Sequence, residues 1–181
     1  LSTGERRDFR RNTQVVFQNS HGAVNPRFPA WKIIGEPLLN FGNPTKADLR
    51  EQAATLLHKV GLSTGDMDKL PHRFSGGELQ RICIARALAL NPAFILLDEA
   101  VSALDMLNQT LVLELLAELK ATTGTTFLFI SHDLRVLLKI SDSLAVMDRG
   151  RISSYVPDLS SLESADIFQD PAFRTLAPAG L

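Results

Sequence analysis

Residues 91–105 read NPAFILLDEAVSALD, and this stretch decides the fold. Its apolar part, residues 94–97, is short and unbroken and follows the Asn-Pro pair at 91–92. Such a run predicts a strand that is buried on both faces, which is typical of a parallel sheet. Two adjacent carboxylates, Asp98 and Glu99, end the run. Because functional sites of open parallel sheets lie at the carboxyl ends of the strands, this pair is a candidate site.

Two carboxylates at a strand end can perform different tasks. One can hold a hydrated Mg²⁺ ion, and the other can orient or deprotonate a water molecule. The alternative is that Asp98 only caps the segment that follows it. The pair alone does not decide between these interpretations, but the segments on either side favour chemistry.

Length and composition limit the class of protein. A chain of 181 residues suits one domain with a sizeable core. Nineteen basic and twenty acidic residues give a net charge of −1, so charge does not favour nucleic acid as a partner. No apolar run reaches the roughly 18 residues of a membrane span, and no signal peptide is visible. The single cysteine, Cys83, excludes an internal disulfide and is typical of a reducing compartment.

Apolar periodicity predicts strands that alternate with helices. The strands are expected at residues 13–17, 94–97, 125–130, 144–147 and 151–156, and the helices at 45–60, 74–90, 106–120 and 134–140. This alternation predicts an α/β fold with a mainly parallel sheet, in which 125–130 is also a buried strand. Residues 26–39 are apolar with weak helical character, and we expect core there ahead of a docking patch. The basic cluster at 6–11 predicts a solvated surface, with a membrane-surface role as the alternative.

Polar side chains follow two further strands. Gln18 comes directly after residues 13–17, and its amide can reach a metal or a water, although a turn former is the commoner role for such a residue. His132 follows residues 125–130, at the same topological position as Asp98 and Glu99. For His132 we favour function over a structural role.

Residues 74–90, FSGGELQRICIARALAL, predict a helix that opens at Ser75-Gly76-Gly77. The free N–H groups and the dipole at a helix N-terminus attract anions. Two glycines let the backbone approach a phosphate closely, and the serine hydroxyl adds a donor. Taken alone, the tripeptide favours the alternative of an ordinary serine cap. Cys83 lies among apolar neighbours in this helix and is expected to be a buried small side chain, not a reactive thiol.

Together these residues resemble the ATP-binding subunits of ABC transporters. Gln18 after VVF matches the Q-loop, and FSGGELQR at 74–81 is similar to the ABC signature. FILLDE at 94–99 matches Walker B with its catalytic glutamate, SALD at 102–105 matches the D-loop, and His132 matches the switch histidine. The ordered set is far more specific than any single motif.

The resemblance covers roughly residues 13–152 and implies an architecture. The fold would be a P-loop NTPase-like, mainly parallel sheet flanked by helices, with a helical subdomain at about 26–90 that carries the signature. The ATP-binding domain would occupy residues 1–156 and a C-terminal tail residues 157–181. The sequence contains no Walker A motif, GxxxxGK followed by Ser or Thr. We therefore expect that the N-terminal part of the domain is missing.

The resemblance implies ATP and Mg²⁺ as ligands. Asp98 would hold Mg²⁺ through water, and Glu99 would polarise the attacking water. Gln18 would sense Mg²⁺ and the γ-phosphate, which His132 would contact. In this family two subunits face each other with ATP between them, so the signature serves the nucleotide held by the opposite subunit.

Within the signature, Ser75 and Gly77 would grip the γ-phosphate, with Gly76 and Glu78 in the same nucleotide-binding motif. Asp105 would help to form the interface between the subunits. Glu78 stands where the family usually has Gln, and Phe74 where it usually has Leu.

The loop NSHGAVNPR at 19–27 resembles the Q-loop extension of importers for peptides, nickel and metallophores. The run DEAVSALD, with Ala100 and Val101, looks most like the second ATPase subunit of nickel importers. The implied function is to energise uptake of nickel or small peptides. The implied partners are a second ATPase subunit and transmembrane permeases, without nucleic acid, at the cytoplasmic face of the inner membrane. The alternatives are a soluble ABC-type ATPase of translation or DNA repair, or a non-catalytic partner subunit.

Overall fold

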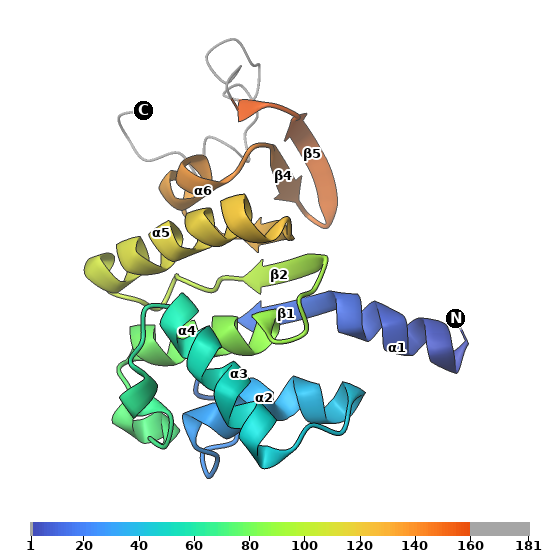
Figure 1. Ribbon diagram of the computed structural model, residues 1–181. Coiled ribbons are helices and arrows are strands. Elements are labelled where there is room, and N and C mark those ends of the chain that lie inside the picture. The colour runs from blue at the N-terminus through green and yellow to red at the C-terminus, as the bar shows by residue number, and fades with distance from the viewer. Residues whose placement is uncertain (1, 160–181) are drawn as a thin grey trace. The chain divides into compact units, whose positions relative to one another are not determined.

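The computed structural model describes residues 2–159. The chain consists of two compact units. The first unit comprises Leu1–Ile130 and the second Ser131–Leu181 (Figure 1). Only the first three residues of the predicted tail at 157–181 are among the described residues.

A three-stranded parallel sheet forms the centre of the first unit. Its order is β1-β2-β3, with β1 at Thr13–Phe17, β2 at Phe94–Asp98 and β3 at Thr126–Ile130. The register pairs Phe17 with Asp98 and Asp98 with Ile130, so all three strands end at the same level. Ile95 and Leu97 of β2 are buried on one face of the sheet, whereas the alternate residues of this strand are half-buried. The prediction of an α/β fold with a mainly parallel sheet is confirmed.

Three helices group beside β1 in Figure 1. They are α2 (Ala30–Phe41), α3 (Lys46–Lys59) and α4 (Gly76–Leu88), with two short 3₁₀ turns at Thr64–Asp66 and Pro71–Arg73 between the last two. Their shared core consists of wholly buried aliphatic side chains, among them Ile34, Leu57, Leu79 and Ile82. The longest helix, α5 (Met106–Thr123), follows β2 and ends at Gly124, whose φ of 66° suits glycine at a helix end.

The prediction of weak helical character for residues 26–39 is wrong. Helix α2 begins at Ala30 and continues through Pro37, although proline removes one helical hydrogen bond. Ile33 and Ile34 on its inner face are buried, so tertiary packing outweighs the unfavourable local sequence. The accompanying prediction that this segment contributes to the core is confirmed for these two side chains.

The prediction that residues 125–130 are fully buried is also wrong for the described chain. Strand β3 pairs only with β2 among residues 2–159, and its burial alternates between exposed and half-buried. Leu128 and Ile130 keep 49% and 44% of their surface exposed. The sequence composition of a central strand therefore occurs here at a sheet edge.

Helix α1 (Thr3–Asn12) precedes β1 and buries none of its residues. A reciprocal capping box between Ser2 and Glu5 begins it, which satisfies backbone donors that have no acceptor within the helix. The predicted solvated surface of the basic cluster at 6–11 is confirmed, and these residues form a helix.

The described part of the second unit contains α6 (Leu134–Ile140) and a hairpin. Strands β4 (Leu144–Asp148) and β5 (Arg151–Val156) pair antiparallel and form a two-stranded sheet of their own. The two-residue turn has positive φ at Arg149 and Gly150, which is the geometry that tight hairpins require.

Leu97→Ala should lower the free energy of unfolding by about 2–5 kcal/mol, because it leaves a cavity in the central strand. Leu97 is wholly buried, whereas Leu107 on α5 is 70% exposed. Leu107→Ala should therefore change the free energy of unfolding by less than about 0.5 kcal/mol. Urea unfolding of both variants measures the difference, and equal midpoints would contradict the central place of β2.

Candidate functional site

The sheet register brings Gln18 and Glu99 to one edge, because each directly follows one of the paired residues Phe17 and Asp98. Gln18 Nε2 donates to Ser102 Oγ at 3.0 Å, and Ser102 Oγ in turn donates to the Glu99 carbonyl at 3.0 Å. Ser102 was predicted only as part of the D-loop. Its hydroxyl joins the loop after β1 to the loop after β2.

Glu99 has an unusual backbone conformation. Its φ is 47°, in the left-handed region that non-glycine residues adopt at a cost of about 1–2 kcal/mol. The Glu99 N–H donates to the Ile130 carbonyl at 3.0 Å, and the two following side chains, Ala100 and Val101, are buried. These contacts hold the strained backbone. Strain of this kind gathers at functional sites, which supports Glu99 as a candidate.

Helix α4 holds the loop after β1 through three side chains spaced along one face. Gln80 Nε2 donates to the Phe17 carbonyl at 3.4 Å, and Arg86 Nη1 donates to the Ala23 carbonyl at 2.6 Å. Between them, Cys83 Sγ lies 3.9 Å from the Ser20 carbonyl. All three contacts reach backbone oxygens, so they fix the path of the loop whatever its side chains are.

Sequence reasoning missed Gln80 and Arg86 as members of the site. A signal was present, since a polar residue inside the buried face of a helix must find a partner, and Gln80 is only 1% exposed. Cys83 is buried as predicted. Burial raises the pKa of its thiol to about 11, so the reactive thiolate is scarce at neutral pH. This environment agrees with the prediction that Cys83 is not a reactive thiol.

The N-terminus of α4 is built by Ser75 and Glu78. The Ser75 hydroxyl accepts from the Glu78 N–H at 3.3 Å, and the Ser75 N–H donates to Glu78 Oε2 at 2.8 Å. The alternative role for Ser75, an ordinary helix cap, is therefore present in the structure. The hydroxyl proton of Ser75 stays available for a ligand, as do the N–H groups of Gly76 and Gly77, which have no acceptor within the helix.

The Glu78 carboxylate adds a negative charge to this helix end. The backbone N–H of Ser75 is the main cause that lowers the pKa of Glu78, with the Ser75 hydroxyl and Arg81 acting in the same direction. Glu78 is therefore ionised at neutral pH, beside a position at which the sequence predicts a phosphate.

The two glycines of the signature lie in different environments. A side chain at Gly76 would meet only Leu104 Cδ2, at 3.9 Å, whereas a side chain at Gly77 would clash with the amide of Asn108. Asn108 is itself held, because its Nδ2 donates to Asp105 Oδ2 at 2.6 Å and its N–H to Asp105 Oδ1 at 3.0 Å. The signature thus packs against Asn108, which is held by Asp105 of the predicted D-loop.

The structure groups the predicted residues into two clusters within the first unit. The first contains Gln18, Asp98 and Glu99 at the sheet edge. The second contains Ser75, Gly76, Gly77, Glu78 and Asp105. His132 lies two residues after Ile130 and belongs to the second unit, so its place in the site stays a prediction.

The first cluster fits a magnesium ion that is bound together with a nucleotide. Mg²⁺ keeps several waters and takes one or two carboxylates plus phosphate oxygens. Asp98 at the end of β2 and the Gln18 amide provide oxygen ligands of this kind. Among residues 2–159, no group of three or more His, Cys, Asp or Glu could hold a metal by itself, so phosphate oxygens would have to complete the coordination.

The family of the protein follows from comparison with known proteins. The family model described as ABC transporter matches residues 1–102, more than half of the chain. The chain belongs to the ABC transporter family. The resemblance drawn from the Q-loop, signature, Walker B and D-loop motifs is therefore confirmed.

The chain is similar to proteins named nickel import ATP-binding protein NikE. It is 44% identical to that of Rhodospirillum rubrum over 99% of this chain and 63% of the relative. It is also 44% identical to those of Brucella abortus and Escherichia coli O157:H7, covering 96% and 84% of this chain and 64% and 57% of the relatives. The chain thus spans less than two thirds of the curated relatives it matches.

Two solved structures share the fold. One is a dimeric ATP-binding cassette in a post-hydrolysis state bound to ADP and Pi, with a TM-score of 0.72, 27% identity, and coverage of 86% of this chain and 67% of that one. The other is CbiO1 from Clostridium perfringens, part of the ABC transporter complex CbiONQ, with a TM-score of 0.78, 22% identity, and coverage of 96% and 68%. Within residues 2–159 no helix has the length and apolar character to cross a membrane.

Gly77→Ala should destabilise the protein by about 1–3 kcal/mol, because the new methyl group overpacks the contact with Asn108. Gly76→Ala is the matched control and should be neutral or slightly stabilising, since its methyl group enters open space. The double variant with Asn108→Ala should regain part of the loss. Thermal unfolding measures all three, and equal melting temperatures for the two glycine variants would contradict the close packing.

Glu78→Gln should remove a pH-dependent part of the stability. Because the folded pKa of Glu78 lies below its usual value of 4.5, the ionised group stabilises the fold above that pH, and this stabilisation is lost as the pH falls through the lowered pKa. The wild type should therefore melt above the variant at neutral pH, and the difference should close in acid. Melting curves over pH test this, with Glu118→Gln on α5 as the charge control. A difference that widens in acid would contradict it.

Proposed function

We propose that the full-length protein is the ATP-binding and ATP-hydrolysing subunit of an importer for nickel or small peptides. The hydrogen bonds from Gln18 through Ser102 to the Glu99 carbonyl are the observation that carries the proposal. They join the Q-loop to the Walker B glutamate, which are the two parts that must act on one nucleotide. Membership of the ABC transporter family and the names of the NikE relatives support the choice of reaction and of cargo.

Asp98 and Gln18 would bind the magnesium of MgATP at the sheet edge. The ion supplies charge neutralisation for the phosphates when it is bound. Asp98 suits this role because it ends the central strand and its backbone is fixed by pairing on both sides. Gln18 suits it because Ser102 and the contacts from α4 fix the loop that carries it.

Glu99 would orient and polarise the water that attacks the γ-phosphate. Its backbone N–H is anchored on Ile130 and its carbonyl accepts from Ser102, so the carboxylate begins from a fixed point. Phosphoryl transfer to water depends mostly on positioning and charge stabilisation, and such anchoring supplies the first of these. By its match to the switch histidine, His132 would contact the γ-phosphate.

The signature would serve a nucleotide held by a second ATPase subunit. The N–H groups of Gly76 and Gly77 and the hydroxyl proton of Ser75 form a donor set at a helix N-terminus, which suits a phosphate. The Asp105–Asn108 pair braces this helix end from the side. Because the same chain contributes both clusters, two copies or two related subunits would complete two equivalent sites.

The permease partners would dock on the start of α2 and its neighbours, residues 26–50. Lys32 Nζ lies 3.9 Å from the centroid of the Phe28 ring, and Lys46 and Arg50 lie 5.7 Å and 5.6 Å from that of Trp31. This mixture of half-exposed aromatic rings and cations is typical of protein interfaces. Such docking would place the protein at the cytoplasmic face of the inner membrane.

Glu99→Gln should lower ATP turnover by roughly 10²–10⁴-fold in the assembled full-length transporter, while MgATP still binds. The amide keeps the size of the side chain and removes its charge. Glu114→Gln on the exposed face of α5 removes the same charge and should leave turnover unchanged. Release of phosphate from ATP measures the effect, and undiminished turnover in Glu99→Gln would contradict the proposed role.

A further inference from the structure

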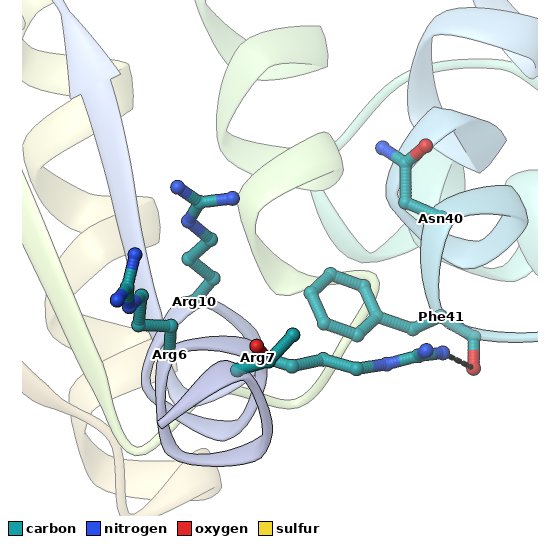
Figure 2. Close-up of a pocket in the computed structure, with 6 residues that line it drawn as sticks. Arg6, Arg7, Arg10, Asn40 and Phe41 are labelled. Atoms are coloured by element: carbon teal, nitrogen blue, oxygen red, sulfur yellow. Dashed lines mark hydrogen bonds between the residues drawn. The ribbon is translucent and has the colours of Figure 1, made fainter. Parts of the chain in front are cut away.

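A hollow between α1 and the end of α2 is lined by three arginines. Its volume is about 440 Å³, and its lining residues are Thr3, Arg6, Arg7, Arg10, Asn40 and Phe41. Figure 2 shows Arg6 and Arg10 on the side of α1 and Asn40 and Phe41 opposite them, with the Arg7 side chain reaching across to the Phe41 carbonyl. None of these six residues carries a carboxylate. The proposed ATP reaction uses none of them.

The charge is gathered on one face of α1. Positions 3, 6, 7 and 10 follow the i, i+3, i+4, i+7 spacing and therefore point to the same side of the helix. The acidic residues Glu5 and Asp8 fall on the opposite side. Arginines three and four positions apart repel one another, and an anion bound against them would relieve this repulsion.

Two of the three arginines also have a structural role within the chain. Arg7 Nη2 donates to the Phe41 carbonyl at 3.3 Å, and its guanidinium carbon lies 5.6 Å from the centroid of the Phe41 ring (Figure 2). Arg7 therefore caps the last carbonyl of α2 and fixes α1 against it. Arg10, in the last turn of α1, also favours the helix dipole.

We propose that this hollow, the arginine groove, binds a phosphate-bearing ligand through Arg6, Arg7 and Arg10. The guanidinium fork matches the oxygens of a phosphate in pairs. A phosphate monoester carries nearly two negative charges at neutral pH, which suits three cations better than the single charge of a carboxylate. The hydroxyl of Thr3 and the amide of Asn40 add neutral donors at the rim.

Such a phosphate can belong to a soluble compound or to a lipid headgroup. A groove of this volume accommodates either, because ligand sites commonly measure about 300–1,000 Å³. The chemistry that binds the phosphate is the same in both cases, and two arms of one experiment distinguish the sources.

The experiment uses the purified full-length protein, saturated with MgADP so that the probe does not enter the nucleotide site. One arm titrates inorganic pyrophosphate by calorimetry. The other measures cosedimentation with phosphatidylcholine vesicles that contain or lack phosphatidic acid. Arg10→Gln tests the groove, and Arg11→Gln is the matched control. Arg11→Gln removes the same charge from the next position of α1. The Arg11 side chain lines a different hollow, together with residues of α3 and the end of α4.

Arg10→Gln should weaken binding roughly fivefold or more in at least one arm, while Arg11→Gln leaves it near the wild-type value. Arg10→Lys should recover part of the loss. Loss in the pyrophosphate arm alone identifies a soluble phosphate, and loss in the vesicle arm alone identifies a headgroup. Absence of binding in both arms, or equal weakening by Arg10→Gln and Arg11→Gln, would overturn the proposal, whatever the ATPase activity is.

Discussion

The parallel pairing of β2 with both of its neighbours is the constraint on which the site depends. It sets Phe17, Asp98 and Ile130 level, so the residues that follow them leave the sheet at one edge. A slip of one residue would turn every side chain of a strand to the other face and carry Gln18 away from Ser102. Burial opposes such a slip, because Val16, Ile95 and Leu97 each fill the core from alternate positions. A few aliphatic side chains in five-residue strands therefore determine where the carboxylates and the amide meet.

Helix α4 links the two clusters mechanically. Its N-terminus carries Ser75, Gly76 and Gly77, and further along it Gln80 and Arg86 hold the carbonyls of Phe17 and Ala23. Because these contacts are to backbone, a displacement of α4 displaces the loop that carries Gln18. A phosphate at the helix N-terminus and a metal at the sheet edge would then be sensed by one rigid element. A single helix with polar contacts along its length is sufficient for this coupling, without a chain of contacting side chains between the two clusters.

Much of the fold could be predicted because it follows from local pattern. Apolar spacing is enough to predict the strands at 13–17 and 94–98. Apolar spacing and the Thr45–Asp48 capping box together predict the helix at 46–59. The errors have physical reasons. The helix through Pro37 exists because Ile33 and Ile34 are buried, and burial is not a local property. Ser102 could not be identified as the link between two loops, because its role depends on a register that joins residues 84 positions apart.

For the two glycines of the signature, the sequence suggests one common reason for glycine, whereas the structure shows a different reason at each position. Both were attributed to the approach of a phosphate, and the open surroundings of Gly76 suit that reason. Gly77 has a different constraint, because Asn108 occupies the space that its side chain would need. Asn108 is held by Asp105, and Asp105 caps α5, so the D-loop and the signature are packed into one surface. A protomer that presents this surface to a partner's nucleotide presents both motifs together, since neither can move without displacing the Asn108 amide.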